Sequence, residues 1–332
     1  AQRYLMERFI TSGATVRGDV RQRGGHVVLN NPKIKAADYK PDLKVVSYDI
    51  ETAIDTLQLY CIAVYACFKG VTSQCVFMLG EGANQDFVIS VNSQEELLDA
   101  FLEWVGDYDP DVLIGWNVVN FDTWYLQRIA DVSRRRLALG RDGRQVRWRE
   151  LDDEGQRRNA QLDGRVILDG IELLRAAFYR FESFSLENVS RQLLGEGKLL
   201  HGSDRGGQIG ELFQHDKSEL ADYNLKDCKL VHDIFDHTAL MAFAVARSQL
   251  TGLNIDRMGG SVASFDNLYL PTLHRRGYVA PNASTDPIAS PGGFVLDSMP
   301  GLYDHVLVLD FKSLYPVSFV LSLLILWDWR SG

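Results

Sequence analysis

The segment Val45-Val46-Ser47-Tyr48-Asp49-Ile50-Glu51 decides how this 332-residue sequence is interpreted. Its β-branched and aromatic residues predict a strand that ends in acids. Side chains at positions i and i+2 of a strand share one face, so we expect Asp49 and Glu51 side by side, with Ile50 on the other face. Two neighbouring carboxylates on an apolar strand either lie at a solvated strand end or hold a cation between them. The segment alone leaves both interpretations open.

The sequence that follows this strand predicts a mixed sheet covered by helices. Leu59–Val64 and Cys75–Leu79 are strand-like, which predicts three adjacent strands. Ser93-Gln94-Glu95-Glu96 has capping-box spacing and predicts a helix to about Val105. Further along we expect strands at Val112–Gly115 and Arg165–Asp169, and helices at Phe121–Leu139, Leu186–Leu194 and Lys217–Met241. Strands followed by strands alternating with helices indicate an α/β (mixed α+β) fold.

The sequence divides into three predicted regions. Residues 1–41 carry short strands and turns, including an Asn30-Asn31-Pro32 turn, and are expected to form part of a β-rich N-terminal domain. Residues 42–241 hold the α/β fold. Residues 242–332 combine a helical connection with a predicted strand at Val306–Asp310.

Composition narrows the class of protein. With 46% hydrophobic and 24% charged residues, the chain is typical of a globular protein that buries a full core. It has neither an apolar run of about 20 residues nor a signal-peptide layout, so we expect a cytoplasmic protein without a membrane partner. Its four cysteines form no C-x-x-C pair, and those at positions 61, 67 and 75 are expected to be buried in strands.

The net charge of −9 argues against nucleic-acid binding, because phosphate contacts need Lys and Arg, but the local distribution of charge matters more than the total. Between Arg128 and Arg165 there are eleven arginines against seven acidic residues. This basic stretch either contacts phosphates or decorates a solvated helix and loop, and charge alone slightly favours the second interpretation.

Two further acidic motifs follow the first. Asn117 and Asp122 come just after the predicted strand Val112–Gly115, where an Asp is also a common helix N-cap. Tyr223 and Asp227 are four residues apart in a predicted helix and therefore share one face, although such pairs also occur as surface packing. Each motif is weak alone, and the conjunction of all three is specific.

These three segments resemble the Exo I, Exo II and Exo III motifs of the proofreading exonuclease of family B DNA polymerases. The similarity extends from residue 4 to about residue 316 and is strongest to bacterial members. It implies a ribonuclease H-like fold and 3′→5′ exodeoxyribonuclease activity on DNA, at a single-stranded 3′ end or primer terminus. It also implies a bacterial, nucleoid-associated protein and a sliding clamp as partner of the full-length parent.

The resemblance also implies a role for each site residue. Two Mg²⁺ or Mn²⁺ ions are implied, one held by Asp49, Glu51 and Asp227 and the other by Asp49 with Asp122, in keeping with hard oxygen ligands. Tyr223 would orient the attacking water. Related exonucleases carry a His five residues before the last Asp, a position that is Asp222 here, so the site resembles the tyrosine type.

Asn117 and Phe121 would contact the terminal nucleotides, with core packing as the alternative for Phe121. Asp169 is expected to be structural or to lie just behind the ligands.

A second family motif lies near the end of the sequence. Asp310-Phe311-Lys312-Ser313-Leu314-Tyr315-Pro316 resembles motif A of the polymerase palm, where Asp310 would bind metal and Tyr315 would exclude a ribose 2′-OH. Ser290–Phe294 resembles the glycine motif that connects the exonuclease and polymerase parts. Ser313 and Leu314 belong to the same motif A segment. The later palm motifs are missing, so polymerisation is not expected, and the apolar run Val317–Trp327 is expected to bury itself against another surface.

Two other functions compete with the exonuclease. One is a DNA-binding fragment whose site is idle. The other is an independent exonuclease acting on RNA, against which the motif A segment argues.

Overall fold

The computed structural model describes residues 2–23, 26–151, 157–197, 205–257, 260–280 and 296–309. The chain divides into a compact unit of residues 1–280 and a second unit of residues 281–332. The boundaries after residues 41 and 241 stay predictions.

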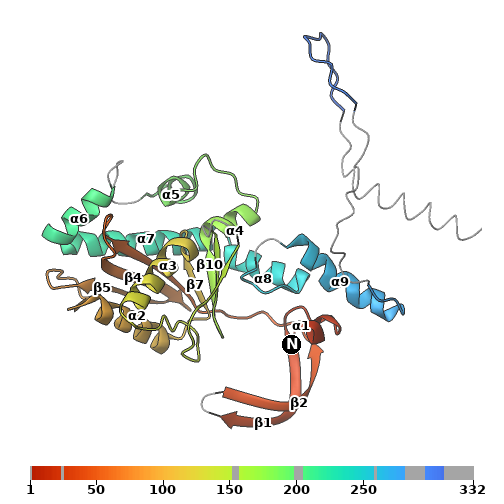
Figure 1. Cartoon of the computed structure of the whole chain (residues 1–332), viewed down its shortest axis with the longest axis horizontal. Helices are drawn as coiled ribbons and strands as arrows, with labels where there is room; N and C mark the ends of the chain where they lie inside the picture. Colours follow the sequence, from red (N-terminus) through yellow and green to blue (C-terminus); the bar gives the residue numbers. More distant parts are fainter. Residues whose placement is uncertain are drawn as a thin grey trace, which may run out of the picture. The chain divides into compact units, whose positions relative to one another are not determined.

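A six-stranded mixed sheet forms the centre of the first unit (Figure 1). Its strand order is β10 (Val166–Asp169), β7 (Val112–Gly115), β3 (Val45–Thr52), β4 (Leu59–Phe68), β5 (Val71–Leu79) and β6 (Val88–Val91). Strands β3, β4 and β5 pair antiparallel, while β10–β7, β7–β3 and β5–β6 are parallel. The predicted α/β fold and the three adjacent strands are thereby confirmed.

Helices cover both faces of this sheet, which makes the unit three-layered (Figure 1). Helices α2 (Gln94–Tyr108) and α3 (Trp124–Val132) pack on one face, where Tyr48 and Ile50 join Phe101 in a buried cluster. Helix α7 (Lys217–His237) packs on the other face, against β3, β4 and β5. Because side chains alternate along β3, Val46, Tyr48 and Ile50 face α2 and α3, whereas Asp49 and Glu51 face α7.

The first unit contains further helices and strands. They are α1 (Gln2–Met6), β1 (Ala14–Arg23), β2 (His26–Ala36), β8 (Arg147–Glu150), β9 (Arg158–Gln161), α4 (Gly170–Ala176), α5 (Leu186–Leu194), α6 (Arg205–His215), α8 (Leu240–Thr251) and α9 (Ser261–Arg275).

Local hydrogen bonds explain where α2 begins and ends. The Ser93 hydroxyl accepts a hydrogen bond from the Glu96 backbone N–H at 3.2 Å, as the capping-box spacing predicts. The helix continues past Val105 and ends where Asp109 adopts a left-handed conformation with φ 51°.

Two predicted helices are shorter than expected. The helix predicted at Phe121–Leu139 begins as a π-helical turn, η1 (Val119–Thr123), and ends at Val132, because Arg134 adopts φ 54°. The helix predicted at Lys217–Met241 is broken into α7 and α8 at Ala239, with φ 52°. Helices that end in a left-handed residue usually have glycine there. Because these two positions are Arg and Ala, the sequence does not indicate that the helices end at them.

The N-terminal region forms one antiparallel hairpin of two long strands, β1 and β2. The predicted Asn30-Asn31-Pro32 turn is wrong: these residues lie inside β2, where the register shifts opposite Gly18. An extra residue in one strand makes a β-bulge, a position in which a sheet tolerates proline.

Other expectations fail or fall outside the described residues. Residues 306–309 form no strand and are exposed, since residues 296–309 include no second strand with which they could pair. Asp310, Ser313, Leu314, Tyr315, Ser290–Phe294 and Val317–Trp327 lie outside the described residues. Cys61, Cys75 and Cys228 are buried, whereas Cys67 is exposed near the end of β4. Within the described ranges, no helix is both long and apolar enough to cross a bilayer.

Candidate active site

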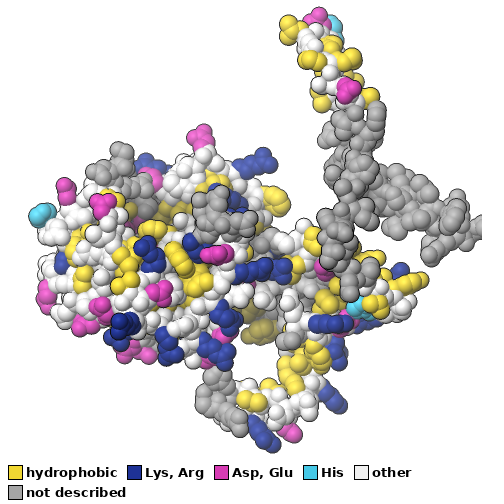
Figure 2. Space-filling model, viewed as in Figure 1, with side chains coloured by type: hydrophobic (Ala, Val, Ile, Leu, Met, Phe, Trp, Pro, Cys, Tyr) yellow, Lys and Arg dark blue, Asp and Glu magenta, His cyan; other side chains and the backbone are white. Residues whose placement is uncertain are grey.

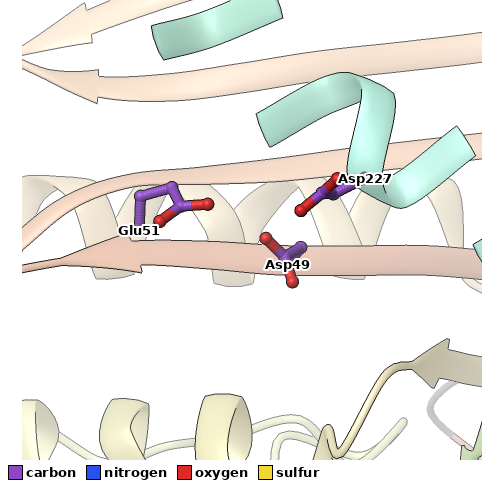
Figure 3. A group of neighbouring side chains, drawn as sticks. All are labelled: Asp49, Glu51 and Asp227. Atoms are coloured by element: carbon purple, nitrogen blue, oxygen red, sulfur yellow. The ribbon is translucent and has the colours of Figure 1, made fainter. Parts of the chain in front are cut away.

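Three acidic side chains from two distant elements meet on the α7 face of the sheet. Asp49 and Glu51 project from β3, and Asp227 projects toward them from α7 (Figure 3). One carboxylate oxygen of each residue lies within 4.8 Å of one from each of the others. The cation interpretation of the Asp49–Glu51 pair is therefore favoured over a solvated strand end.

The chemistry of this group fits a divalent cation. Glu51 is 7% exposed and Asp227 is 1% exposed, so bulk water screens their negative charges poorly. Three hard carboxylate ligands match the preference of Mg²⁺ and Mn²⁺. The group can therefore hold a metal ion.

A buried amide fixes the orientation of Asp49. The side-chain nitrogen of Asn224, on α7, donates to Asp49 Oδ2 at 2.7 Å. The thiol of Cys61, on β4, donates to the amide oxygen of Asn224 at 3.4 Å. Because the thiol fixes which end of the amide carries oxygen, the amide N–H group is directed at Asp49. Sequence reasoning missed Asn224, although its place three residues before Asp227 puts both on one helix face.

Asp122 lies beside this group without joining it. Its side chain is 1% exposed, and its Oδ1 accepts a hydrogen bond from the Ile50 backbone N–H at 3.1 Å. Burial, reinforced by the nearby charge of Asp49, raises the pKa of Asp122 well above its usual value. Asp122 sits inside η1 and caps no helix, so the capping alternative is wrong.

The fold holds the η1 turn tightly against the sheet. Tyr48 and Thr123 hydroxyls are 2.6 Å apart, and the Thr123 hydroxyl donates to the Val118 carbonyl at 2.7 Å. A Cβ atom at Gly115 would lie 2.6 Å from the Val118 side chain. Glycine at the end of β7 is therefore required for this close approach, which places Asp122 next to β3.

Tyr223 lies one helical turn before Asp227 on α7, as its spacing predicts. It is 2% exposed and belongs to the apolar cluster between α7, α6 and the sheet, which excludes simple surface packing. Asp222, the preceding residue, is exposed, and its carboxylate accepts a hydrogen bond from the Gln85 side-chain nitrogen at 3.0 Å.

A cleft of about 420 Å³ opens beside Glu51. Phe121 lines it and is 46% exposed, so the core-packing alternative for Phe121 is wrong. Asn117 is also exposed, with a left-handed φ of 58°, but it does not line this cleft.

The cleft wall includes side chains that sequence reasoning missed. Trp124, Tyr125 and Arg128 line it together with Phe121. Their spacing of three and four residues from one another is that of one helix face, which was the available signal.

Asp169 is the N-cap of α4, in agreement with a structural role. Its Oδ1 accepts hydrogen bonds from the Ile171 and Glu172 backbone N–H groups at 2.9 and 3.2 Å. The residue is 8% exposed, and burial raises the pKa of its carboxyl to about 6.

This raised pKa predicts a pH-dependent effect of Asp169→Asn. Between pH 4 and pH 6 the unfolded chain releases this proton while the folded chain keeps it, so Asp169 lowers stability as pH rises. Asparagine caps helices as well as Asp but carries no charge. We expect Asp169→Asn to raise the free energy of unfolding by roughly 2–3 kcal/mol at pH 8 and to leave it unchanged at pH 4.

Urea unfolding in a chelating buffer at both pH values measures this difference. Asp169→Ala separates charge from capping, because at pH 4 it should lose about 1 kcal/mol through the missing cap. Equal stability of wild type and Asp169→Asn at pH 8 would contradict the burial argument.

Comparisons with known proteins agree with this geometry. Residues 26–189 match the family described as DNA polymerase family B, exonuclease domain. The chain carries a family B DNA polymerase exonuclease domain. It is 50% identical to DNA polymerase II of Escherichia coli (strain K12) over 323 residues, which cover 95% of this chain and 40% of that protein.

More distant relatives are also DNA polymerases. The DNA polymerase of Desulfurococcus sp. (strain Tok) is 28% identical over 83% of this chain and 36% of its own length. The DNA-directed DNA polymerase of Escherichia phage RB69 is 27% identical over 68% of this chain and 25% of its own length. The chain with its exonuclease domain thus spans less than half of each of these relatives.

Proposed function

We propose that this exonuclease domain removes nucleotides from the 3′ end of DNA by hydrolysing the terminal phosphodiester bond. The observation that carries the proposal is the convergence of Asp49, Glu51 and Asp227 within 4.8 Å, beside a cleft into which Phe121 is exposed. A buried anionic group is poorly suited to hold a phosphate unless cations lie between them. Phosphodiester hydrolysis assisted by metal ions is therefore the chemistry that the site supports best.

Each residue has a role in this proposal. Asp49, Glu51 and Asp227 would hold one Mg²⁺ or Mn²⁺ ion, and Asp49 with Asp122 a second. When bound, such ions supply Lewis-acid stabilisation of the phosphoryl oxygens and lower the pKa of the attacking water.

The remaining residues act on the water and on the substrate. Tyr223 would orient the water by hydrogen bonding, and Phe121 would stack on a terminal base. Asn117 would contact the terminal nucleotides. In a full-length parent we propose a proofreading role on nucleoid DNA, with a sliding clamp as partner.

A directionality assay tests the proposal. Single-stranded DNA labelled at its 5′ end is incubated with the protein and Mg²⁺ or Mn²⁺, and the products are resolved by length. We expect a ladder that shortens by single nucleotides from the 3′ end, and protection by a 3′-terminal phosphorothioate linkage.

RNA of the same sequence separates the competing functions. Intact DNA that is nevertheless bound would support the idle DNA-binding fragment. Faster loss of RNA than of DNA would support an independent ribonuclease and contradict the proposal.

A further inference from the structure

Most of the basic stretch between Arg128 and Arg165 is neutralised by nearby acids. The arginines that form ion pairs are Arg135 with Asp99, Arg141 with Asp109 and Asp111, Arg144 with Asp142 and Asp163, Arg147 with Asp163, Arg157 with Glu172, and Arg165 with Asp109. Figure 2 likewise shows Lys and Arg interspersed with Asp and Glu over the face that it draws. The excess of arginine in the sequence therefore does not make a broad basic surface.

Arg128 differs from these arginines in its ion pairing and in its position in the cleft. It is exposed, and among the described residues it has no ion-pair partner within 4.0 Å. It lines the same cleft as Glu51 and Phe121. The positively charged guanidinium of Arg128 can bind an anionic group of a ligand in this cleft. Such a ligand would extend from the carboxylates along the cleft to Arg128.

The side chains next to Arg128 complete a surface for a nucleic-acid strand. Phe121 and Tyr125 lie with ring centroids 6.2 Å apart, and Trp124 lines the cleft on the same helix. Phe121 is exposed, whereas Trp124 and Tyr125 are half-buried. An exposed aromatic ring beside an arginine is a combination with which proteins hold single strands by stacking and backbone contact.

The spacing along the helix separates Arg128 from the scissile position. Arg128 follows Asp122 by six residues, and the α-helical part of this spacing, from Trp124 to Arg128, rises about 6 Å. This exceeds the rise of about 3.4 Å per nucleotide in a stacked strand. This spacing leaves room near Arg128 for a phosphate other than the one at the carboxylates.

We propose that Arg128 binds a backbone phosphate upstream of the scissile bond and thereby makes the site specific for a strand rather than for a single nucleotide. This inference rests on the proposed function of the cleft. The guanidinium would donate two hydrogen bonds to one phosphate, a geometry that lysine cannot reproduce.

Two substrates of different length test this assignment. One is a single-stranded oligodeoxynucleotide, and the other is the p-nitrophenyl ester of thymidine 5′-monophosphate, which has no upstream phosphate. We expect Arg128→Ala to lower kcat/KM for the oligonucleotide about 10- to 100-fold, chiefly through KM, as the loss of a charge-assisted hydrogen bond predicts. Hydrolysis of the small ester should be unchanged.

Salt dependence provides a second readout, and Arg136→Ala provides the matched control. Arg136 is an exposed arginine of the same stretch that does not line the cleft. Loss of one phosphate contact should reduce the slope of log affinity against log salt by about 0.7 for a single strand. We expect this change for Arg128→Ala and none for Arg136→Ala, with Arg128→Lys restoring the slope but not the full affinity.

The outcomes distinguish this inference from the proposed function. Binding of a fluorescent oligonucleotide, measured in Ca²⁺, needs no hydrolysis and so reports on Arg128 even if the wild type hydrolyses nothing. Equal losses on both substrates, an unchanged salt slope in Arg128→Ala, or an equal loss in Arg136→Ala would each overturn the assignment.

Discussion

Replacing Asp227 by Asn is expected to lower kcat for DNA hydrolysis by about three orders of magnitude, equivalent to about 4 kcal/mol of transition-state stabilisation. Asn keeps the size of the side chain but removes the negative charge of one of the three clustered carboxylates, at a position that is 1% exposed. Initial rates on 5′-labelled single-stranded DNA at saturating Mg²⁺ measure the effect.

Asp222→Asn is the matched control for this prediction. Asp222 lies on the same helix but is exposed. Its substitution should leave kcat unchanged, whereas a comparable loss would contradict the tyrosine type of site. In chelator, unfolding of Asp227→Asn should occur at the same or a higher temperature than that of the wild type, because the substitution removes a buried charge. Full activity of Asp227→Asn would contradict the ligand assignment.

Metal binding is expected to stabilise the folded chain. Asp49 and Glu51 are brought to Asp227 only by folding, so the unfolded chain offers no comparable group. A ligand at one hundred times its Kd that binds only the folded state adds about 2.7 kcal/mol to the free energy of unfolding. For a domain of this size the melting temperature should rise by roughly 5–10 °C.

Thermal unfolding in Mg²⁺ and in chelator, at equal ionic strength, measures this shift. Asp227→Asn should show a much smaller rise, which separates binding at the carboxylates from general screening of charge. Identical melting temperatures of the wild type in Mg²⁺ and in chelator would count against a metal site here. Chelation should also stop DNA hydrolysis, and added Mg²⁺ should restore it.

Local patterns gave the parts of the site that lie close together in the sequence. The alternation of a strand places Asp49 and Glu51 on one face, and the period of a helix places Tyr223 and Asp227 on another. In the structure the carboxylates of Asp49 and Glu51 lie together, and Tyr223 and Asp227 are both buried side chains of α7. The meeting of these two faces depends on packing between elements 175 residues apart, as the Asn224–Asp49 hydrogen bond illustrates. Only the family resemblance anticipated it.

The features that the sequence predicts least well are unusual backbone conformations at residues other than glycine, because the side chains there do not indicate the conformation. In the π-helical turn at Val119–Thr123, Asp122 faces β3 and Phe121 is exposed, whereas the sequence predicts a regular helix from Phe121 onward. The left-handed residues Arg134 and Ala239 end helices without a glycine. Hydrogen bonds and packing from outside each segment stabilise these conformations.

The sequence by itself determined the α/β class of the fold, the face of β3 that carries Asp49 and Glu51, and the eleven arginines between Arg128 and Arg165. The tertiary structure alone decided that Asp227 joins those two carboxylates, and that most of the arginines are paired with acids while Arg128 faces a cleft. The physical reason is that the periods of strands and helices fix only which side chains share a face. Which faces meet, and which charges neutralise one another, depends on contacts between elements that are distant along the chain.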